Sequence, residues 1–129
     1  FWIHIITDNE RAGKRMQIRC FCDLYVSERF EKKKNQVLKK LMERKFQPPF
    51  YLITLAQGEQ NHLDIYSSLL LQQGIYDDET IFIVGIAEDY TSAMSLVECI
   101  TQDTVEKTGG VEIRAYIVEQ QRRFEESRG

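Results

Sequence analysis

Two apolar stretches decide the fold, IFIVGIA at residues 81–87 and FYLITLA at residues 50–56. Apolar side chains fill nearly every position of both stretches, without the alternation of apolar and polar residues that a strand with one solvent-exposed face shows. Continuous apolar runs of this length are typical of parallel strands that are covered on both faces. We therefore expect two neighbouring parallel strands at the centre of an α/β domain.

The segments that follow each stretch predict two β-α-β units. Residues 61–73 carry an apolar stripe at helical spacing, which predicts a helix between the two strands. Residues 91–108 carry a second such stripe, and Gly109 and Gly110 follow it as a stop signal. Residues 111–119 alternate apolar and polar side chains, which indicates an edge strand.

The beginning of the chain predicts a hairpin and a charged helix. The β-branched and aromatic runs at residues 1–8 and 16–23 flank a polar connection that contains glycine, as antiparallel hairpins do. Ser27 follows as a helix N-cap, with acidic residues near it and basic residues later. An amphipathic helix is expected over residues 28–45, and the proline pair 48–49 stops it.

The element order ββαβαβαβ predicts a three-layer α/β domain with a mixed, mostly parallel five-stranded sheet. Residues 1–119 are expected to form a single domain and residues 120–129 a polar tail, either a short helix or frayed. The 129 residues suit one core, and no apolar run approaches the roughly 18 residues of a membrane helix. The three cysteines show no spacing of a disulfide scaffold, so a reducing, cytoplasmic compartment is expected.

Acidic side chains follow the predicted strands where a ligand site is physically expected. In open α/β sheets, ligands bind outside the carboxyl ends of the parallel strands. Carboxylates that converge there are suited to Mg²⁺ or Mn²⁺ and to chemistry on a phosphorylated substrate, with His62 as general acid or base. The alternative is ordinary solvated surface. The expected metal ligands are Asp23, Glu59, Glu88 and Asp89.

The loop before the predicted helix at residues 61–73 offers a second kind of site. Backbone N–H groups at a helix start can hold an anion, and Gln57, Gly58 and Asn61 are the residues that would bind such a cofactor. A single glycine serves equally well in an ordinary turn. A phosphate loop would bring more glycines or a lysine.

Charge is segregated along the chain. Residues 28–45 hold eight basic and three acidic side chains, a net charge of +5, whereas the whole chain carries -3. This stripe could meet polyanions, an acidic partner or a second copy of the chain, or it could simply be a solvated helix face. A pI of 5.4 argues against dedicated nucleic-acid binding. The stripe consists of Arg29, Lys32, Lys33, Lys40 and Arg44.

No stretch matches a catalytic or cofactor fingerprint, and no nucleophile elbow is present. The expected function is a regulatory module that binds a ligand or a protein, either another copy or the remainder of its own chain. The apolar residues Phe1, Trp2 and Phe124 near the two ends motivate the protein partner. The alternatives are a divalent-metal enzyme and a polyanion binder, and no membrane partner is expected.

Overall fold

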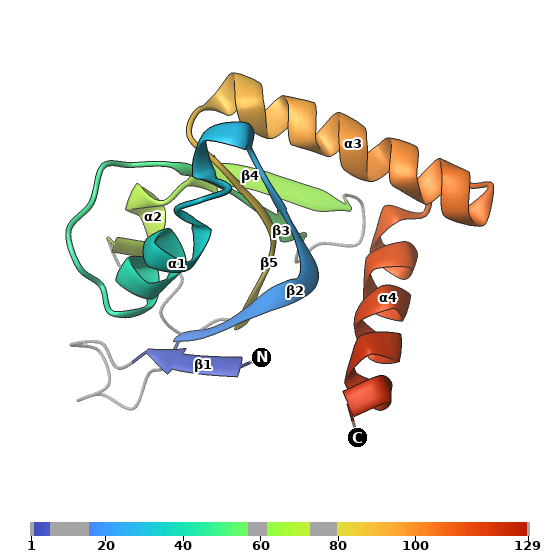
Figure 1. Cartoon of the computed structure of the whole chain (residues 1–129), viewed down its shortest axis with the longest axis horizontal. Helices are drawn as coiled ribbons and strands as arrows, with labels where there is room; N and C mark the ends of the chain where they lie inside the picture. The colour runs from blue at the N-terminus through green and yellow to red at the C-terminus, as the bar shows by residue number, and fades with distance from the viewer. Residues whose placement is uncertain (1, 6–15, 57–61, 73–79, 129) are drawn as a thin grey trace.

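The computed structural model describes residues 2–5, 16–56, 62–72 and 80–128, and their centre is one mixed β-sheet (Figure 1). In sheet order the strands are β1 (Trp2–Ile5), β2 (Met16–Val26), β5 (Thr80–Ala87), β3 (Tyr51–Leu55) and β4 (Leu63–Ser67). The helices are the 3-10 turn η2 (Glu28–Phe30), α1 (Lys34–Met42), α2 (Leu69–Gln72), α3 (Tyr90–Thr108) and α4 (Ile113–Arg128). The predicted α/β class with a mixed sheet is confirmed.

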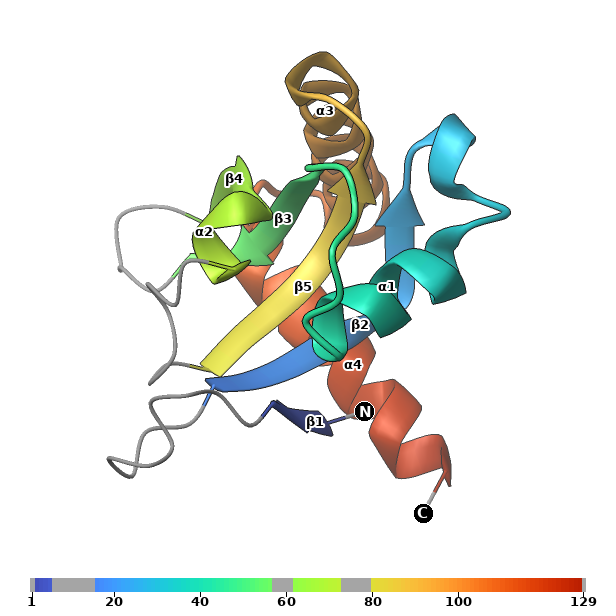
Figure 2. The same ribbon diagram turned by 90° about the vertical axis from the view of Figure 1, so that its left-hand side faces the viewer.

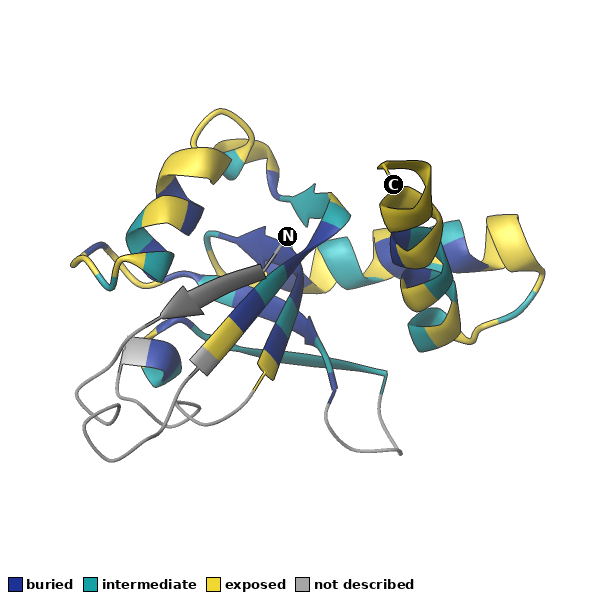
Figure 3. Cartoon of the chain, turned by 90° about the horizontal axis from the view of Figure 1, so that it is seen from below, coloured by how far each residue is buried: buried dark blue, intermediate teal, exposed yellow. Residues whose placement is uncertain are grey.

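Helices cover both faces of the sheet (Figure 1, Figure 2). On one face, Leu38 of α1 and Leu71 of α2 belong to a buried apolar cluster with side chains of β2, β3 and β5. On the other face, Ile100 of α3 and Ile117 of α4 belong to a second cluster with the same three strands. Figure 3 shows the buried residues concentrated in the sheet and on the helix faces turned toward it. The sheet thus separates two cores.

The central strand pairing differs from the prediction. β3 and β5 are neighbours, but they run antiparallel, with Leu52 opposite Ile86. The parallel pair is instead β2 with β5, and the β1–β2 and β3–β4 pairs are antiparallel. The prediction of a mostly parallel sheet is therefore wrong. A continuous apolar run indicates that a strand is covered on both faces, but it does not indicate whether the strand runs parallel or antiparallel to its neighbours.

The predicted helix at residues 61–73 is replaced by strand β4 and the single turn α2. Leu63 and Ile65 pack in the cluster under α3, whereas Tyr66 packs in the cluster under α1. The side chains therefore follow the period of a strand. Leu63 and Tyr66 fit a helical stripe equally well, because a short apolar run satisfies both periods. The hairpin that β4 makes with β3 sets the direction of β3 against β5.

The predicted edge strand at residues 111–119 is wrong, since Ile113–Arg128 form helix α4. Ile113, Tyr116 and Ile117 pack in the cluster under α3, and Gln121 is buried one turn later. This spacing of three and four residues is helical. The boundary expected at residue 119 falls inside the helix, and the polar tail continues it almost to the end of the chain.

The predicted helix at residues 28–45 is divided in two. The turn η2 comes first, and α1 begins only at Lys34, after Lys33 with a ψ near 1° and no side-chain cap. α1 ends in a left-handed residue, Arg44, with a φ of 57°. The backbone N–H of Lys45 then donates to the oxygen of Lys40 at 2.9 Å, which is the Schellman arrangement. The chain therefore leaves α1 before it reaches Pro48.

β2 and β5 share an irregularity at their centre. The register moves from Cys20 opposite Ile83 to Tyr25 opposite Gly85, so β2 carries extra residues at this point. Gly85 lies where the bulge presses on β5, and a Cβ atom there would lie 3.0 Å from the backbone oxygen of Tyr25. The bulge needs a glycine on the neighbouring strand.

Among the described helices, none is both long enough and apolar enough to cross a membrane.

Candidate functional site

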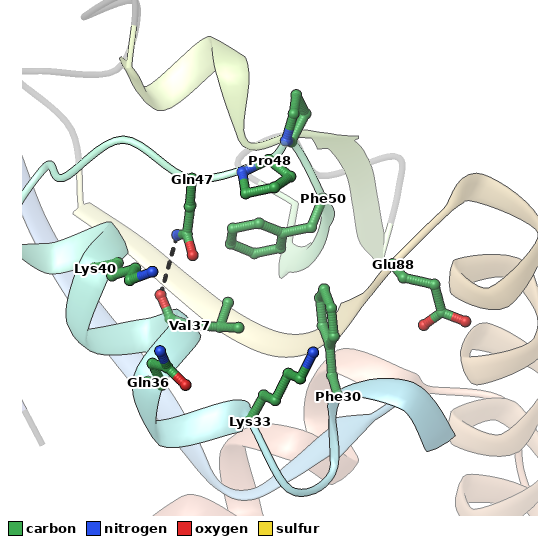
Figure 4. A pocket seen from close by; sticks show the side chains of 10 residues that line it. Phe30, Lys33, Gln36, Val37, Lys40, Gln47, Pro48, Phe50 and Glu88 are labelled. Carbon is green, nitrogen blue, oxygen red and sulfur yellow. Dashed lines mark hydrogen bonds between the residues drawn. The ribbon is translucent and has the colours of Figure 1, made fainter.

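A cleft of about 400 Å³ opens beside α1, at the edge of the sheet where β5 ends (Figure 4). Its walls come from η2, from the first two turns of α1, from the segment 47–50 and from Glu88, the residue after β5. β2 runs parallel to β5 and ends at the same edge. We call this hollow the α1 cleft.

The floor of the α1 cleft is apolar. Phe30 and Phe50 meet edge to face, with ring centroids 5.8 Å apart and an interplanar angle of 74°. Phe50 is 1% exposed, and two hydrogen bonds with Ser68 hold its backbone, from Phe50 N to Ser68 Oγ at 3.1 Å and from Ser68 N to Phe50 O at 2.8 Å. Val37 of α1 completes the floor. These contacts fix two aromatic rings at the base of an open hollow.

One wall of the α1 cleft is tied to α1 by a buried amide. The side chain of Gln47 is 6% exposed, and its Nε2 donates to the backbone oxygen of Val37 at 3.2 Å. The dashed line in Figure 4 marks this bond. Pro48 and Pro49 follow Gln47 and remain exposed at the rim. The segment therefore passes beside α1 without covering the floor.

Two basic side chains stand on the rim. Lys33 begins the approach to α1 and Lys40 lies two turns later, and both line the α1 cleft together with Gln36. In Figure 4 the amino group of Lys33 lies next to the ring of Phe30. The structure thus places positive charge beside an aromatic floor.

The carboxylate of Glu88 lies at the far end of the α1 cleft, beyond Phe30 in Figure 4. The hydroxyl of Ser27 donates to its Oε2, and the hydroxyl of Ser92 donates to its Oε1 at 2.8 Å. Partial burial acts to raise the pKa of Glu88, but these hydroxyl bonds outweigh burial and hold the pKa below its ordinary value. Glu88 is therefore an oriented, ionised acceptor.

Asp89, the next residue, caps helix α3. Its Oδ1 accepts a hydrogen bond from the backbone N–H of Ser92 at 2.7 Å. This backbone bond is the main reason that the pKa of Asp89 is lowered, and the positive charge of Arg29 adds a smaller effect. Asp89 does not line the α1 cleft. Its carboxylate does the work of an ordinary helix N-cap.

Asp23 lies inside strand β2, whereas the sequence placed it after the strand. It precedes the Tyr25–Gly85 pair, and Glu88 lies three residues beyond that pair, so roughly 10 Å or more of strand separates the backbones of Asp23 and Glu88. Asp23 instead approaches Tyr25. Burial is the main cause that raises the pKa of Tyr25, and the carboxylates of Asp103 and Asp23 add to it.

His62 precedes β4 and does not lie in a helix as predicted. Its Nδ1 accepts a hydrogen bond from the backbone N–H of Arg114, in the first turn of α4, at 3.3 Å. Its backbone oxygen accepts another from the N–H of Ala56 at 3.1 Å. In the structure His62 therefore joins the β3–β4 hairpin to the start of α4, away from the α1 cleft.

The remaining expected ligands Gln57, Gly58, Glu59 and Asn61 lie outside the described residues. β3, which precedes them, runs antiparallel to β5 and so ends at the opposite edge of the sheet from Glu88. Across residues 2–5, 16–56, 62–72 and 80–128, no three His, Cys, Asp or Glu side chains are grouped as a metal site requires.

The predicted basic stripe is divided by the break before α1. Lys33 and Lys40 reach the α1 cleft, but Arg29 and Lys32 do not line it. Arg44 has a structural task, because its Nη2 donates to the backbone oxygen of Leu71 at 3.2 Å and so joins the end of α1 to α2. Two members of the stripe thus belong to the candidate site.

Sequence reasoning missed the aromatic and amide members of the α1 cleft. Phe30 has the spacing of a core residue, and Phe50 begins an apolar strand, so neither signals a surface site. Gln47 stands before two prolines in a segment without periodicity. A weak signal of this site in the sequence was the proline pair 48–49 between the basic helix and the apolar strand, because prolines continue neither a helix nor a central strand.

No family model, no curated protein and no solved structure matches this chain.

Proposed function

We propose that this chain is a ligand-binding module, and that the α1 cleft binds a small molecule in which an apolar ring carries a negative charge. The observation that supports the proposal is the pairing of an aromatic floor, Phe30 and Phe50, with two lysines on the rim, Lys33 and Lys40. A volume of about 400 Å³ falls in the usual range for ligand pockets.

The location of the α1 cleft also supports a binding role. It lies at the edge where the parallel strands β2 and β5 both end, and this is the edge at which open α/β sheets bind ligands. The hydrogen bonds of Gln47 and Phe50 hold the floor and one wall in place before any ligand arrives. Preformed walls reduce the entropy that binding costs.

Each part of the site contributes differently to affinity. A ring packed against Phe30, which Phe50 supports from below, loses water from its apolar surface, and this favours binding in proportion to the area removed from water. Lys33 and Lys40 act as flexible point charges, so they contribute attraction with little geometric selection. For a ligand of ring and phosphate alone we expect a Kd on the order of 1 mM.

The test is a calorimetric or NMR titration with phenyl phosphate. Phenol lacks the charge and inorganic phosphate lacks the ring, so both should bind at least about fivefold more weakly. The double variant Lys33→Gln, Lys40→Gln should lose most of the affinity for phenyl phosphate. The matched control Lys32→Gln, Lys39→Gln removes two exposed charges that do not line the cleft and should keep that affinity.

Equal binding of phenol and phenyl phosphate would contradict the proposal, because the lysines would then have no part in recognition. Equal affinity of both double variants would contradict it as well.

A further inference from the structure

Charge is separated along the α1 cleft. In Figure 4, Lys40 stands at one end with the amides of Gln36 and Gln47, the amino group of Lys33 lies beside Phe30, and Glu88 stands at the other end beyond Phe30. A ligand with a negative group alone would satisfy the lysines and leave Glu88 to repel it. The second end of the ligand therefore needs hydrogen-bond donors.

Glu88 is prepared to accept such donors. Ser27 and Ser92 occupy one lone pair on each of its carboxylate oxygens, and a carboxylate has about four such positions. The two serines also come from different elements, the end of β2 and the first turn of α3, so they fix the direction of the carboxylate. An ionised carboxylate forms stronger hydrogen bonds than a neutral acceptor.

The space between the two ends suits a flat ring. Phe30 lies between Lys40 and Glu88 in Figure 4, with the amino group of Lys33 beside its ring, and Phe50 supports it edge to face. Every nucleic-acid base has a π-face, so any base can stack on an aromatic side chain. The α1 cleft therefore offers, in order, a place for an anion, a place for a ring and a place for the donors on the far edge of that ring.

We propose that the ligand of the α1 cleft is a mononucleotide with an amino-bearing base. Its phosphate lies beside Lys33 and Lys40, its base lies over Phe30, and the amino group of the base donates to Glu88. This inference rests on the proposed function, because it uses the same cleft and the same two lysines, and it adds the class of ligand and the role of Glu88.

A free nucleotide fits better than a nucleic-acid strand. Outside residues 28–45 the chain carries a net charge of -8, so the surface around the basic segment repels an extended polyanion. A single phosphate beside two lysines experiences less of that repulsion.

The test compares matched nucleotides by calorimetric titration of the whole chain at low salt. AMP and purine riboside 5′-monophosphate differ only by the amino group, and CMP and 2-pyrimidinone riboside 5′-monophosphate differ in the same way, whereas IMP and UMP carry a ring N–H that could itself donate to Glu88. The amino-bearing member of each pair should bind at least about tenfold more tightly, the difference expected for one hydrogen bond to a charged acceptor. A ten-nucleotide single strand should bind no more tightly than AMP.

Glu88→Gln should remove the preference within each pair and leave the lysine-dependent binding of phenyl phosphate in place. Asp89→Asn is the matched control, since Asp89 is adjacent in sequence but does not line the cleft, and it should keep the preference. Thermal unfolding of each variant confirms that it is folded.

Two results would overturn the inference. One is equal binding within both nucleotide pairs, or a preference that survives in Glu88→Gln. The other is tighter binding of the single strand than of AMP. If phenyl phosphate still binds through Lys33 and Lys40 in either case, the proposed function stands without the nucleotide. If phenyl phosphate does not bind, both fail.

Discussion

The two faces of the sheet are covered to different extents. Helices α3 and α4 have 19 and 16 residues, whereas α1 and α2 have 9 and 4. At about 1.5 Å per residue, α3 spans roughly 28 Å and α1 roughly 13 Å. The strand side chains on the α1 side are nevertheless buried, and Phe30 of η2 and Phe50 pack in the same cluster with them.

The α1 cleft opens on the side of the shorter helices, and its lining comes from η2, α1, the segment 47–50 and Glu88. Arg44 turns the chain out of α1, and the Pro48–Pro49 segment returns to β3 without forming a helix. On the opposite face α3 runs on to Gly109, whose φ of 76° ends it, and α4 then packs against the same cluster. The longer helices thus cover one core, and the cleft that we propose as the site lies beside the shorter ones.

Removal of a buried side chain from the face covered by α3 and α4 should have the largest effect on stability. Ile100 is 0% exposed under α3, and Ile100→Ala should lower the free energy of unfolding by about 2–5 kcal/mol, because the cavity cannot refill. Val37→Ala, in the floor of the α1 cleft, should cost less, since its side chain is smaller and solvent can enter. Urea denaturation measures both.

Met94→Ala is the matched control on α3, because Met94 is 40% exposed, and it should change the free energy of unfolding by no more than about 0.5 kcal/mol. A loss for Val37→Ala as large as that for Ile100→Ala would break the comparison between the two faces.

Substitution of Gly85, in the central strand β5, should have the next largest effect on stability. Gly85→Ala puts a Cβ atom 3.0 Å from the backbone oxygen and 3.2 Å from the Cβ of Tyr25, and β2 must move to accept it. We expect a loss of about 1–3 kcal/mol in the free energy of unfolding by urea denaturation. Gly110→Ala, where the nearest atom is 3.9 Å away, is the control and should be nearly neutral. A neutral Gly85→Ala would mean that the bulge does not press on β5.

Loss of a single hydrogen bond on the face covered by α3 and α4 should have a smaller effect on stability. The hydroxyl of Tyr25 donates to Asp103 of α3 at 2.5 Å, and Tyr25→Phe should cost about 0.5–1.5 kcal/mol of unfolding free energy. Burial, followed by Asp103, raises the pKa of Tyr25 above its ordinary value of 10. The folded state thus favours the neutral phenol, and this stabilisation is present below pH 10 and is lost as the pH rises through the raised pKa.

Thermal unfolding between pH 7 and pH 11 tests this bond. The Tyr25→Phe protein should lose less stability in the alkaline range than the natural sequence does. Tyr90→Phe, at an exposed position, is the control. If the natural sequence and Tyr25→Phe lose the same stability between pH 7 and pH 11, the ionisation of Tyr25 does not contribute to alkaline unfolding.

The smallest effect is expected at the junction of the two faces, where β5 leads into α3. The pKa values of Glu88 and Asp89 both lie below their ordinary values of 4.5 and 3.8 in the folded state. Their stabilisation is therefore present above those values and is lost as the pH falls through the lowered ones. Asp89→Asn keeps a capping acceptor but cannot titrate, so it should change the Tm little at pH 7 and flatten its fall below about pH 4.

Measurement of the Tm from pH 7 to pH 3 tests this expectation, with Glu98→Gln on an exposed turn of α3 as the control. If Asp89→Asn and the control have the same acid slope as the natural sequence, the cap does not contribute to acid sensitivity.

The candidate site shows how far sequence reasoning reached. Lys33 and Lys40 were named as part of a basic stripe, and Glu88 was named as a carboxylate at a strand end. The carboxyl edge of β5 was also the expected place for a ligand. Their meeting in one cleft depends on how α1 docks against the sheet, and no local pattern records that docking.

Two element types were assigned wrongly for a related reason. Leu63 and Tyr66 satisfy a helical and a strand period at once, and Ile113 and Ile117 satisfy both alternation and a four-residue spacing. In each case the buried contacts decide the element type, because Ile65 and Ile117 both pack in the cluster under α3. The apolar runs in these segments of thirteen and nine residues are too short for periodicity alone to distinguish a helix from a strand.

By itself, the sequence determined the α/β class, the two buried central strands and the long helix that ends at Gly109. Each of these rests on local properties, namely apolar content, helical periodicity and the backbone freedom of glycine. Only the tertiary structure decided that β3 runs against β5, that residues 113–128 form a helix and that Lys33, Lys40 and Glu88 share one cleft. These outcomes depend on contacts between residues far apart in the chain, and such contacts leave no signature in the neighbouring residues.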